Sequence, residues 1–154
     1  MKKAMLIVLV LACLALCACS REAKKADIPE AGALAAELLS SGAFTEELGE
    51  IGADVGGFLY GLEESDAPGM RFWCSSGAVS EEIAFFPCRD AAAAEKVLGE
   101  CRARIEQQSR LFADYRAEEV PKLEKALVLQ RENTVVLCVA ADAEKAAAVL
   151  NKYF

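Results

Sequence analysis

The sequence predicts an α+β domain: an antiparallel four-stranded sheet with the order β-β-α-β-β-α, covered by helices and preceded by an N-terminal helix. Two pairs of short segments rich in apolar and aromatic residues are each joined by a brief loop, as in β-hairpins. An aspartate follows each pair and precedes a segment whose apolar residues recur at three- and four-residue steps. That pattern is typical of a capped amphipathic helix.

The first 19 residues have the layout of a bacterial lipoprotein leader. Lys2 and Lys3 precede an apolar stretch from Ala4 to Ala18, and polar residues follow at once. This stretch is too short for the ~30 Å hydrocarbon core, which needs about 20 residues, so a signal peptide is expected over residues 1–18. Small or apolar residues before a cysteine suit the lipoprotein peptidase, which would leave Cys19 as the lipid-bearing first residue.

Other interpretations of the leader stay open. Cys13 follows a similar local sequence, but cleavage there would leave an exposed apolar tail, which favours Cys19. Ordinary signal processing and an uncleaved anchor that thins the bilayer are further alternatives. With Cys19 lipidated, residues 19–27 are a tether. Two acyl chains, at roughly 0.8 kcal/mol per buried CH₂, would anchor the protein on the extracytoplasmic face of the cell membrane.

Length and charge limit the remaining chain to one acidic domain. Removing 18 of 154 residues leaves 136, enough for a single domain over residues 28–154. The leader contains two lysines and no acidic residue, so its loss changes the net charge from −7 to −9. This charge argues against a nucleic-acid partner, which requires a basic surface. It also disfavours adhesion to anionic lipid headgroups, unless Arg21, Lys24 and Lys25 form a basic patch.

The predicted elements follow in order. A helix starts with Pro29 in its first turn, ends at Ser40-Ser41-Gly42, and has an apolar face at helical spacing. Glycines interrupt the pattern between Phe44 and Leu62, where we expect short helical turns and loop. The first hairpin comprises strands over 70–75 and 83–86, and Pro87 should end its second strand or place it at an edge or bulge.

Asp90 is predicted to cap a long helix over 91–115, and Pro121 ends the linker that follows. The second hairpin comprises 126–131 and 134–140, with a turn at Glu132-Asn133. Its second strand is apolar on both faces and should be central, with the N-terminal helix a candidate cover for the second face of the sheet. Asp142 is predicted to cap the final helix. The two strand-strand-helix halves resemble each other, which fits either a duplication or the similarity of any two hairpin-helix units.

The chain contains no histidine, which excludes histidine-based acid-base catalysis, histidine-activated nucleophiles and histidine-ligated zinc. Adjacent carboxylates occur at 46–47, 63–64, 81–82 and 118–119. Neighbours in sequence usually point apart, and such pairs are ordinarily solvated. No catalytic residue, metal site or cofactor site is therefore predicted, and we expect a protein that is not an enzyme.

Four cysteines lie outside the leader, without C-x-x-C spacing. Cys101 and Cys138 fall at apolar positions and are interpreted as core residues. Cys74 and Cys88 lie on the two arms of the first hairpin, so a disulfide between them is one alternative. Four free thiols are the favoured alternative.

Several motifs together resemble the small Gram-positive lipoproteins of domain of unknown function 4358. They are the leader with its cysteine, Gly77-Ala78 followed by residues 81–86, the helix after Asp90, residues 112–115, residues 119–126 and the closing strand and helix. The cysteines at 74, 88 and 101 depart from the family pattern. The resemblance implies a membrane-tethered extracytoplasmic domain and supplies no activity. We expect a binding module for an envelope protein or a small ligand; the alternatives are an accessory subunit of an envelope complex and a histidine-free hydrolase or thiol redox protein.

Overall fold

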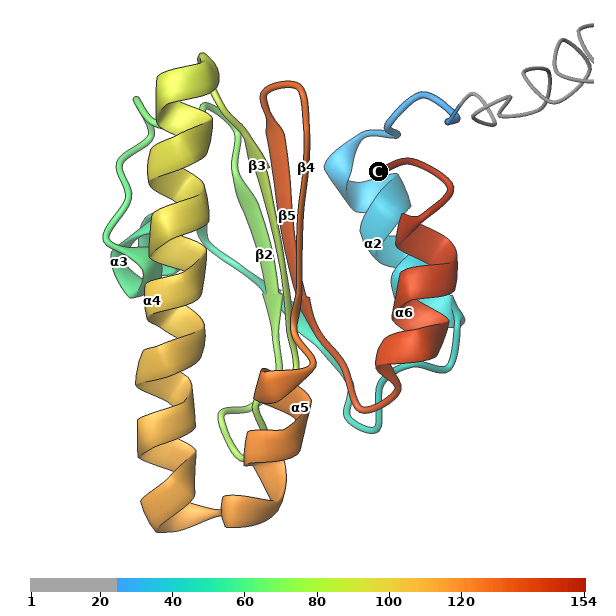
Figure 1. Cartoon of the computed structure of the whole chain (residues 1–154), viewed down its shortest axis with the longest axis vertical. Helices are drawn as coiled ribbons and strands as arrows, with labels where there is room; N and C mark the ends of the chain where they lie inside the picture. The colour runs from blue at the N-terminus through green and yellow to red at the C-terminus, as the bar shows by residue number, and fades with distance from the viewer. Residues whose placement is uncertain (1–24) are drawn as a thin grey trace, which may run out of the picture.

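The computed structural model describes residues 25–154 (Figure 1). The predictions for the signal peptide, for lipid attachment at Cys19 or Cys13, and for most of the tether lie outside these residues. The elements in chain order are α2 (Ala31–Ser40), β1 (Gly49–Ile51), α3 (Ala53–Tyr60), β2 (Arg71–Cys74), β3 (Glu82–Pro87), α4 (Ala91–Tyr115), a 3₁₀ turn (Ala117–Glu119), α5 (Val120–Glu124), β4 (Leu127–Arg131), β5 (Thr134–Val139) and α6 (Ala143–Leu150).

The fold is α+β, as predicted, but its antiparallel sheet has five strands rather than four, in the order β1-β2-β3-β5-β4. The additional strand is β1, which pairs with β2 and brings Ile51 opposite Phe72. It lies in the glycine-interrupted segment interpreted as turns and loop. With three residues, β1 is too short to show the alternation by which a strand is recognised.

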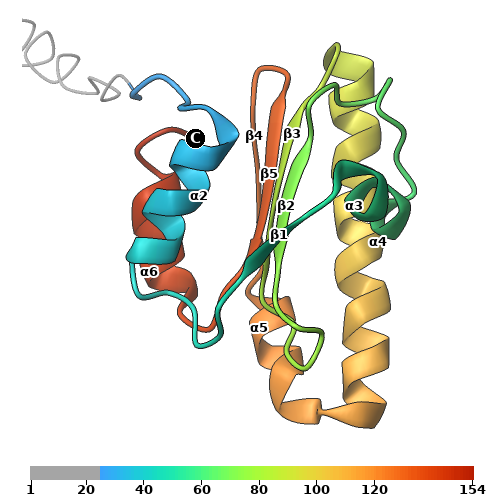
Figure 2. The same ribbon diagram turned by 180° about the vertical axis from the view of Figure 1, so that it is seen from behind.

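Helices cover both faces of the sheet (Figures 1 and 2). The long helix α4 lies on one face together with α3, whereas α2 and α6 lie together on the other; α5 lies at the end of the sheet near the last turns of α4 and contributes Leu123 to the core on the α4 side. The N-terminal helix α2 covers the second face, as expected. We expected the two helices that follow the hairpins to share one face, and this is wrong for α6, which packs beside α2. Because β3 and β5 are buried along nearly their whole length, both faces of the central sheet need a cover.

The two faces form two separate apolar cores, divided by strand alternation. Phe72 and Phe86 point towards α4 and meet Tyr60 of α3, with ring centroids 5.2 to 5.5 Å apart. Trp73 and Ile83 point the opposite way, towards Leu34 and Leu150 and their neighbours. This arrangement follows from the two-residue period of strands.

The predicted caps and stops lie where expected. The Asp90 carboxylate accepts a hydrogen bond from the Ala93 amide at 2.8 Å, and Asp142 accepts one from the Lys145 amide at 3.1 Å. Pro87 ends β3. Pro29, by contrast, precedes α2 instead of lying in its first turn, because the Glu30 side chain caps that helix. The expected linker before Pro121 is partly helical, comprising the 3₁₀ turn and the start of α5.

Candidate functional site: a cleft beside two buried ion-pair networks

A cleft of about 260 Å³ lies between the C-terminal half of α4 and the loop that joins β2 to β3. One wall is a stripe on α4, at helical spacing: Arg104, Gln108, Leu111 and Tyr115. The opposite wall is the loop, which contributes Ser75, Gly77, Val79 and Ser80. Cys74, Glu81 and Glu82 lie where the strands meet the loop.

A buried ion pair forms the floor of the cleft. Arg104 Nη2 lies 3.0 Å from Glu82 Oε2, and Nε donates to Oε1 at 3.3 Å. Only 11% of the Arg104 side chain and 5% of the Glu82 side chain are exposed. The Tyr60 hydroxyl donates to Glu82 at 3.2 Å, and the Arg104 guanidinium lies over the Tyr60 ring. Gln108, with its carbonyl oxygen turned towards Arg104, accepts from Nη1 at 2.6 Å.

The surroundings keep the Arg104 guanidinium and the Tyr60 phenol protonated. Burial opposes the charge on Arg104, but the neighbouring Glu82 carboxylate outweighs that cost and raises the pKa of the guanidinium. Burial, and then the charge of Glu82, raise the pKa of the Tyr60 phenol. A protonated phenol can donate to the carboxylate. Glu82 therefore accepts from Arg104 and Tyr60, as a buried charge requires.

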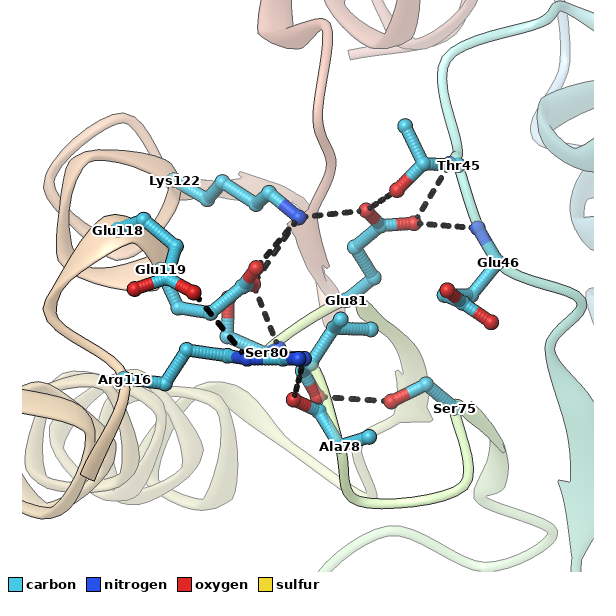
Figure 3. A network of polar contacts seen from close by, with 11 residues as sticks. Thr45, Glu46, Ser75, Ala78, Ser80, Glu81, Arg116, Glu118, Glu119 and Lys122 are labelled. Carbon is cyan, nitrogen blue, oxygen red and sulfur yellow. Dashed lines mark hydrogen bonds and ion pairs between the residues drawn. The ribbon is translucent and has the colours of Figure 1, made fainter.

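The loop wall is held in place by groups of the segment that follows α4 (Figure 3). Glu119 accepts hydrogen bonds from the amide and the hydroxyl of Ser80, both at 3.0 Å, and Arg116 donates to the Ala78 carbonyl at 2.6 Å. Gly77 adopts a positive φ of 87°, which favours glycine at the exposed tip. Hydrogen bonds within the domain thus hold the loop wall of the cleft in place.

A second network joins this wall to the segment before β1 (Figure 3). Lys122 lies between two buried carboxylates, 2.8 Å from Glu81 and 3.0 Å from Glu119. Glu81 also accepts from the Thr45 hydroxyl, from the Thr45 amide at 2.8 Å and from the Glu46 amide at 3.3 Å. Three segments far apart in sequence are linked through one lysine.

Both carboxylates of the second network are held ionised. Burial raises the pKa of Glu81, but hydrogen bonds from Lys122 and Thr45 overcome this effect, and the pKa is lowered. The pKa of Glu119 is lowered in the same way, with burial opposed by the Ser80 amide, Lys122 and the Ser80 hydroxyl. Carboxylates 81 and 82 point apart, as expected, but the expectation that they are solvated is wrong: both are buried, and each joins a different cation.

The mouth of the cleft is apolar. Leu111 is 59% exposed and Tyr115 is 68% exposed, although Phe112 between them is buried. Tyr115 comes three residues after Phe112 and belongs to the three- and four-residue apolar pattern that predicted the helix over 91–115, which would place it on the buried side. The helical period does bring Tyr115 to the same side as Phe112, but that stripe runs beyond the sheet at the last turn of α4. It there faces the cleft.

All four cysteines of residues 25–154 are free thiols. The first hairpin pairs Cys74 with Glu82, which places Cys88 six residues further along the partner strand than a bridge would require. Burial is the main cause that raises the pKa of Cys74 and Cys138 to about 12 and that of Cys88 to about 11; it also raises the pKa of Cys101. Cys101 and Cys138 are core residues, as predicted.

Arg104 and Lys122 are functional-site candidates that sequence reasoning missed. Arg104 lies three residues after buried Cys101 and four before Gln108, so it falls on the apolar side of the helix, although it was not predicted to be buried. A charged residue at a core position of a helix is a usable signal, because a buried charge needs a partner. Lys122 gives no such signal, since it lies in a short segment without a clear period.

Two further structural features bear on the site. Among residues 25–154, no group of three or more acidic or cysteine side chains is arranged to hold a metal ion. The helices of that same part of the chain are all too short or too polar to cross a membrane.

Comparison with known proteins identifies a family. The chain matches no curated protein and no solved structure. The family described as Domain of unknown function (DUF4358) matches residues 58–140, which contain Tyr60, the cleft and the two cations Arg104 and Lys122. Because the match covers more than half of the 154 residues, the chain belongs to the DUF4358 family.

Proposed function

We propose that this protein is a membrane-anchored extracytoplasmic lipoprotein whose domain binds a partner in the cleft between α4 and the β2–β3 loop, without catalysis. The observation that carries the proposal is the combination of a preformed cleft with an apolar mouth and a buried ion pair on its floor. Apolar side chains around a few placed polar groups are typical of ligand sites.

The shape of the cleft favours a small anchor group. Its volume of about 260 Å³ is just below the range of roughly 300 to 1,000 Å³ typical of small-molecule pockets. Leu111 and Tyr115 would contact the apolar part of a side chain, and the pinned loop would lose little entropy on binding. Such preorganisation increases affinity by reducing the cost of ordering.

The electrostatics of the site favour binding over catalysis. A general acid needs a raised carboxyl pKa, whereas the pKa of Glu81 and that of Glu119 are lowered. A thiol nucleophile needs a lowered pKa, whereas the pKa of Cys74 in the cleft is raised to about 12. Both features disfavour the alternative of a hydrolase or thiol redox protein.

The proposal for the membrane anchor is supported by the leader. Basic residues, a short apolar stretch and Cys19 follow one another in the order that lipoprotein processing uses. Mass spectrometry of the native N-terminus tests it. The expected product begins at Cys19 with a diacylglyceryl group, and an unmodified thiol or an intact Met1 would contradict it.

An accessory subunit of an envelope complex is the second candidate function. Val55 and Phe58 lie one helical turn apart on α3 and are 51% and 85% exposed. Large exposed apolar side chains grouped on one helix are typical of subunit contacts. This surface is separate from the lining of the cleft.

Photo-crosslinking in intact cells separates these two functions. A benzoylphenylalanine is placed at Tyr115 in the cleft mouth, or at Phe58 on α3, in the full chain. The binding proposal predicts a defined adduct from position 115 that disappears when Leu111→Glu is added. The control is Val55→Glu, which should leave that adduct unchanged.

Other outcomes decide against the cleft. An adduct from position 58 that Val55→Glu abolishes, with none from position 115, would favour the accessory subunit. An adduct from position 115 that persists with Leu111→Glu would show that the mouth of the cleft does not select the partner. Circular dichroism of each variant confirms that it is folded.

A further inference from the structure

The described chain begins at a fixed point on the domain. The Ala26 amide donates to the Lys152 carbonyl at 2.9 Å, and Lys25 Nζ donates to the Asn151 carbonyl at 2.7 Å. Arg131 at the end of β4 donates to the Ala26 carbonyl and, at 2.8 Å, to the Tyr153 carbonyl. We call these contacts the N-terminal clasp. It ties residues 25 and 26 to the C-terminal turn and to the β4–β5 hairpin.

The segments that form the clasp and those that line the cleft lie at opposite ends of the domain: Figure 1 shows the β4–β5 hairpin at one end and the C-terminal end of α4 with the β2–β3 loop at the other. The first turn of α4 adjoins the tip of the β4–β5 hairpin, because the Cys88 amide donates to the Asn133 carbonyl at 2.8 Å. From Ala91, α4 runs 20 residues to Leu111 at the cleft mouth, which corresponds to about 30 Å at 1.5 Å per residue. The hairpin end and the cleft end of the domain are therefore separated by most of the length of α4.

The covalent chain between Cys19 and Lys25 is short. Six residues reach at most about 20 Å when fully extended. A lipid on Cys19 would therefore keep the clasp end within that distance of the bilayer surface. The domain's negative charge would disfavour its lying flat on anionic headgroups.

We infer that the tethered domain stands with its β4–β5 hairpin end towards the membrane and presents the cleft at its outer end, to a protein partner outside the bilayer and not to membrane lipid. This inference rests on the proposed lipid anchor. The N-terminal clasp sets the orientation, because it fixes which end of the domain the tether leaves. The partner's apolar side chain would enter between Leu111 and the β2–β3 loop.

Fluorescence quenching on vesicles tests the orientation. The full chain, processed and lipidated in a bacterial host, is labelled through Asn133→Cys at the hairpin or Asp114→Cys beside the cleft. It is then placed in phosphatidylcholine vesicles that carry a nitroxide on the headgroup. Of the four thiols in residues 25–154, three are buried and Cys74 is half-buried, so little labelling of them is expected. Labelling of the chain without an added cysteine measures this background.

We expect quenching of the probe at 133 to exceed that of the probe at 114 several-fold. Arg131→Ala should reduce this contrast by releasing the clasp. Arg110→Ala, which removes only an exposed pair with Glu106, is the matched control and should preserve the contrast. Equal or reversed quenching would overturn the inference, and so would an Arg131→Ala variant with unchanged contrast.

The two proposals fail in different ways. If the native N-terminus carries no lipid, both the anchor and the orientation are wrong. If the lipid is present but the two probes are quenched equally, the anchor stands and the orientation is wrong. Binding of the protein to phosphatidylcholine vesicles through the cleft would appear as stronger quenching at 114, and would contradict a protein partner.

Discussion

Arg104 and Glu82 face each other across the floor of the cleft, with Arg104 Nη2 3.0 Å from Glu82 Oε2 and almost all of both side chains buried. The pair joins the middle of α4 to the start of β3. It also fixes Gln108 and Tyr60, so the position of the α4 wall depends on it. The same ion pair therefore forms the floor of the cleft and holds α4 against the sheet.

Removing either member of this pair should destabilise the domain strongly. Arg104→Met leaves a buried carboxylate without its cation, which typically costs about 3 to 5 kcal/mol. The double variant Arg104→Met with Glu82→Gln should recover a large part of that loss, because no uncompensated charge remains. Urea unfolding of the two variants measures the difference. Equal stability of the single and double variants would argue against a coupled pair.

Lys122→Met should also lower the free energy of unfolding, by about 3 to 5 kcal/mol, because Glu81 and Glu119 then stay buried without their shared cation. Lys125→Met is the matched control: Lys125 lies three residues further along, just after the end of α5, and makes no ion pair among the described residues. Its unfolding midpoint in urea should remain close to that of the parent chain. A parent-like midpoint for Lys122→Met would contradict the structural role of the lysine.

The stability of the domain should fall in acid. The pKa of Glu81 and that of Glu119 are lowered below the usual value of 4.5, so the unfolded state binds more protons than the folded state in that range. Their contribution is fully present above pH 4.5 and is lost as the pH falls through the lowered values. Urea unfolding of Glu81→Gln should show a shallower acid loss than the parent chain. An equal or steeper loss would contradict the assignment.

Gly56 should not tolerate a side chain. A Cβ at this position would lie 2.0 Å from the ring of Phe72, whose side chain is buried in the core beneath α3. Gly56→Ala is expected to destabilise the domain by about 1 to 3 kcal/mol or more through overpacking. Gly99→Ala on α4, where a Cβ meets nothing within 4 Å, should instead stabilise it by up to about 1 kcal/mol. Thermal melting compares the two; equal shifts would refute the close packing of α3.

The thiols should react slowly while the domain is folded. Cys74 is half-buried, and its pKa of about 12 leaves little thiolate at neutral pH. Iodoacetamide followed by mass spectrometry should modify Cys74 first, and Cys88, Cys101 and Cys138 only after unfolding. If Cys74 and Cys88 instead stayed unmodified after unfolding and reacted only after reduction, they would form a disulfide, which would contradict this prediction.

Much of the fold follows from periodicity and capping. The helix over 91–115 was predicted because its apolar pattern is long and Asp90 caps it, and both hairpins were predicted because two apolar segments flank a short loop. The third residue of β1, Ile51, contacts the core, but a three-residue strand between glycines has no pattern of its own. The position of α6 beside α2 depends on contacts between helices that lie more than a hundred residues apart.

The site could be predicted only in part. The sequence shows that Glu81 and Glu82 are neighbours, and the opposite orientation of their side chains follows from the alternation of an extended chain. The cations that pair with them could not be predicted from the sequence, because Arg104 and Lys122 belong to distant segments that come close only in the folded domain. Tyr115 fits the apolar spacing of its helix, and only the position of the sheet's end explains why it is exposed beside Leu111.

We propose that the apolar mouth of the cleft selects the partner. Crosslinking in intact cells from a benzoylphenylalanine at position 115, with and without Leu111→Glu, measures this directly. The predicted result is one adduct that is lost with Leu111→Glu and kept with Val55→Glu. No adduct from position 115, or an adduct that both variants retain, would contradict it.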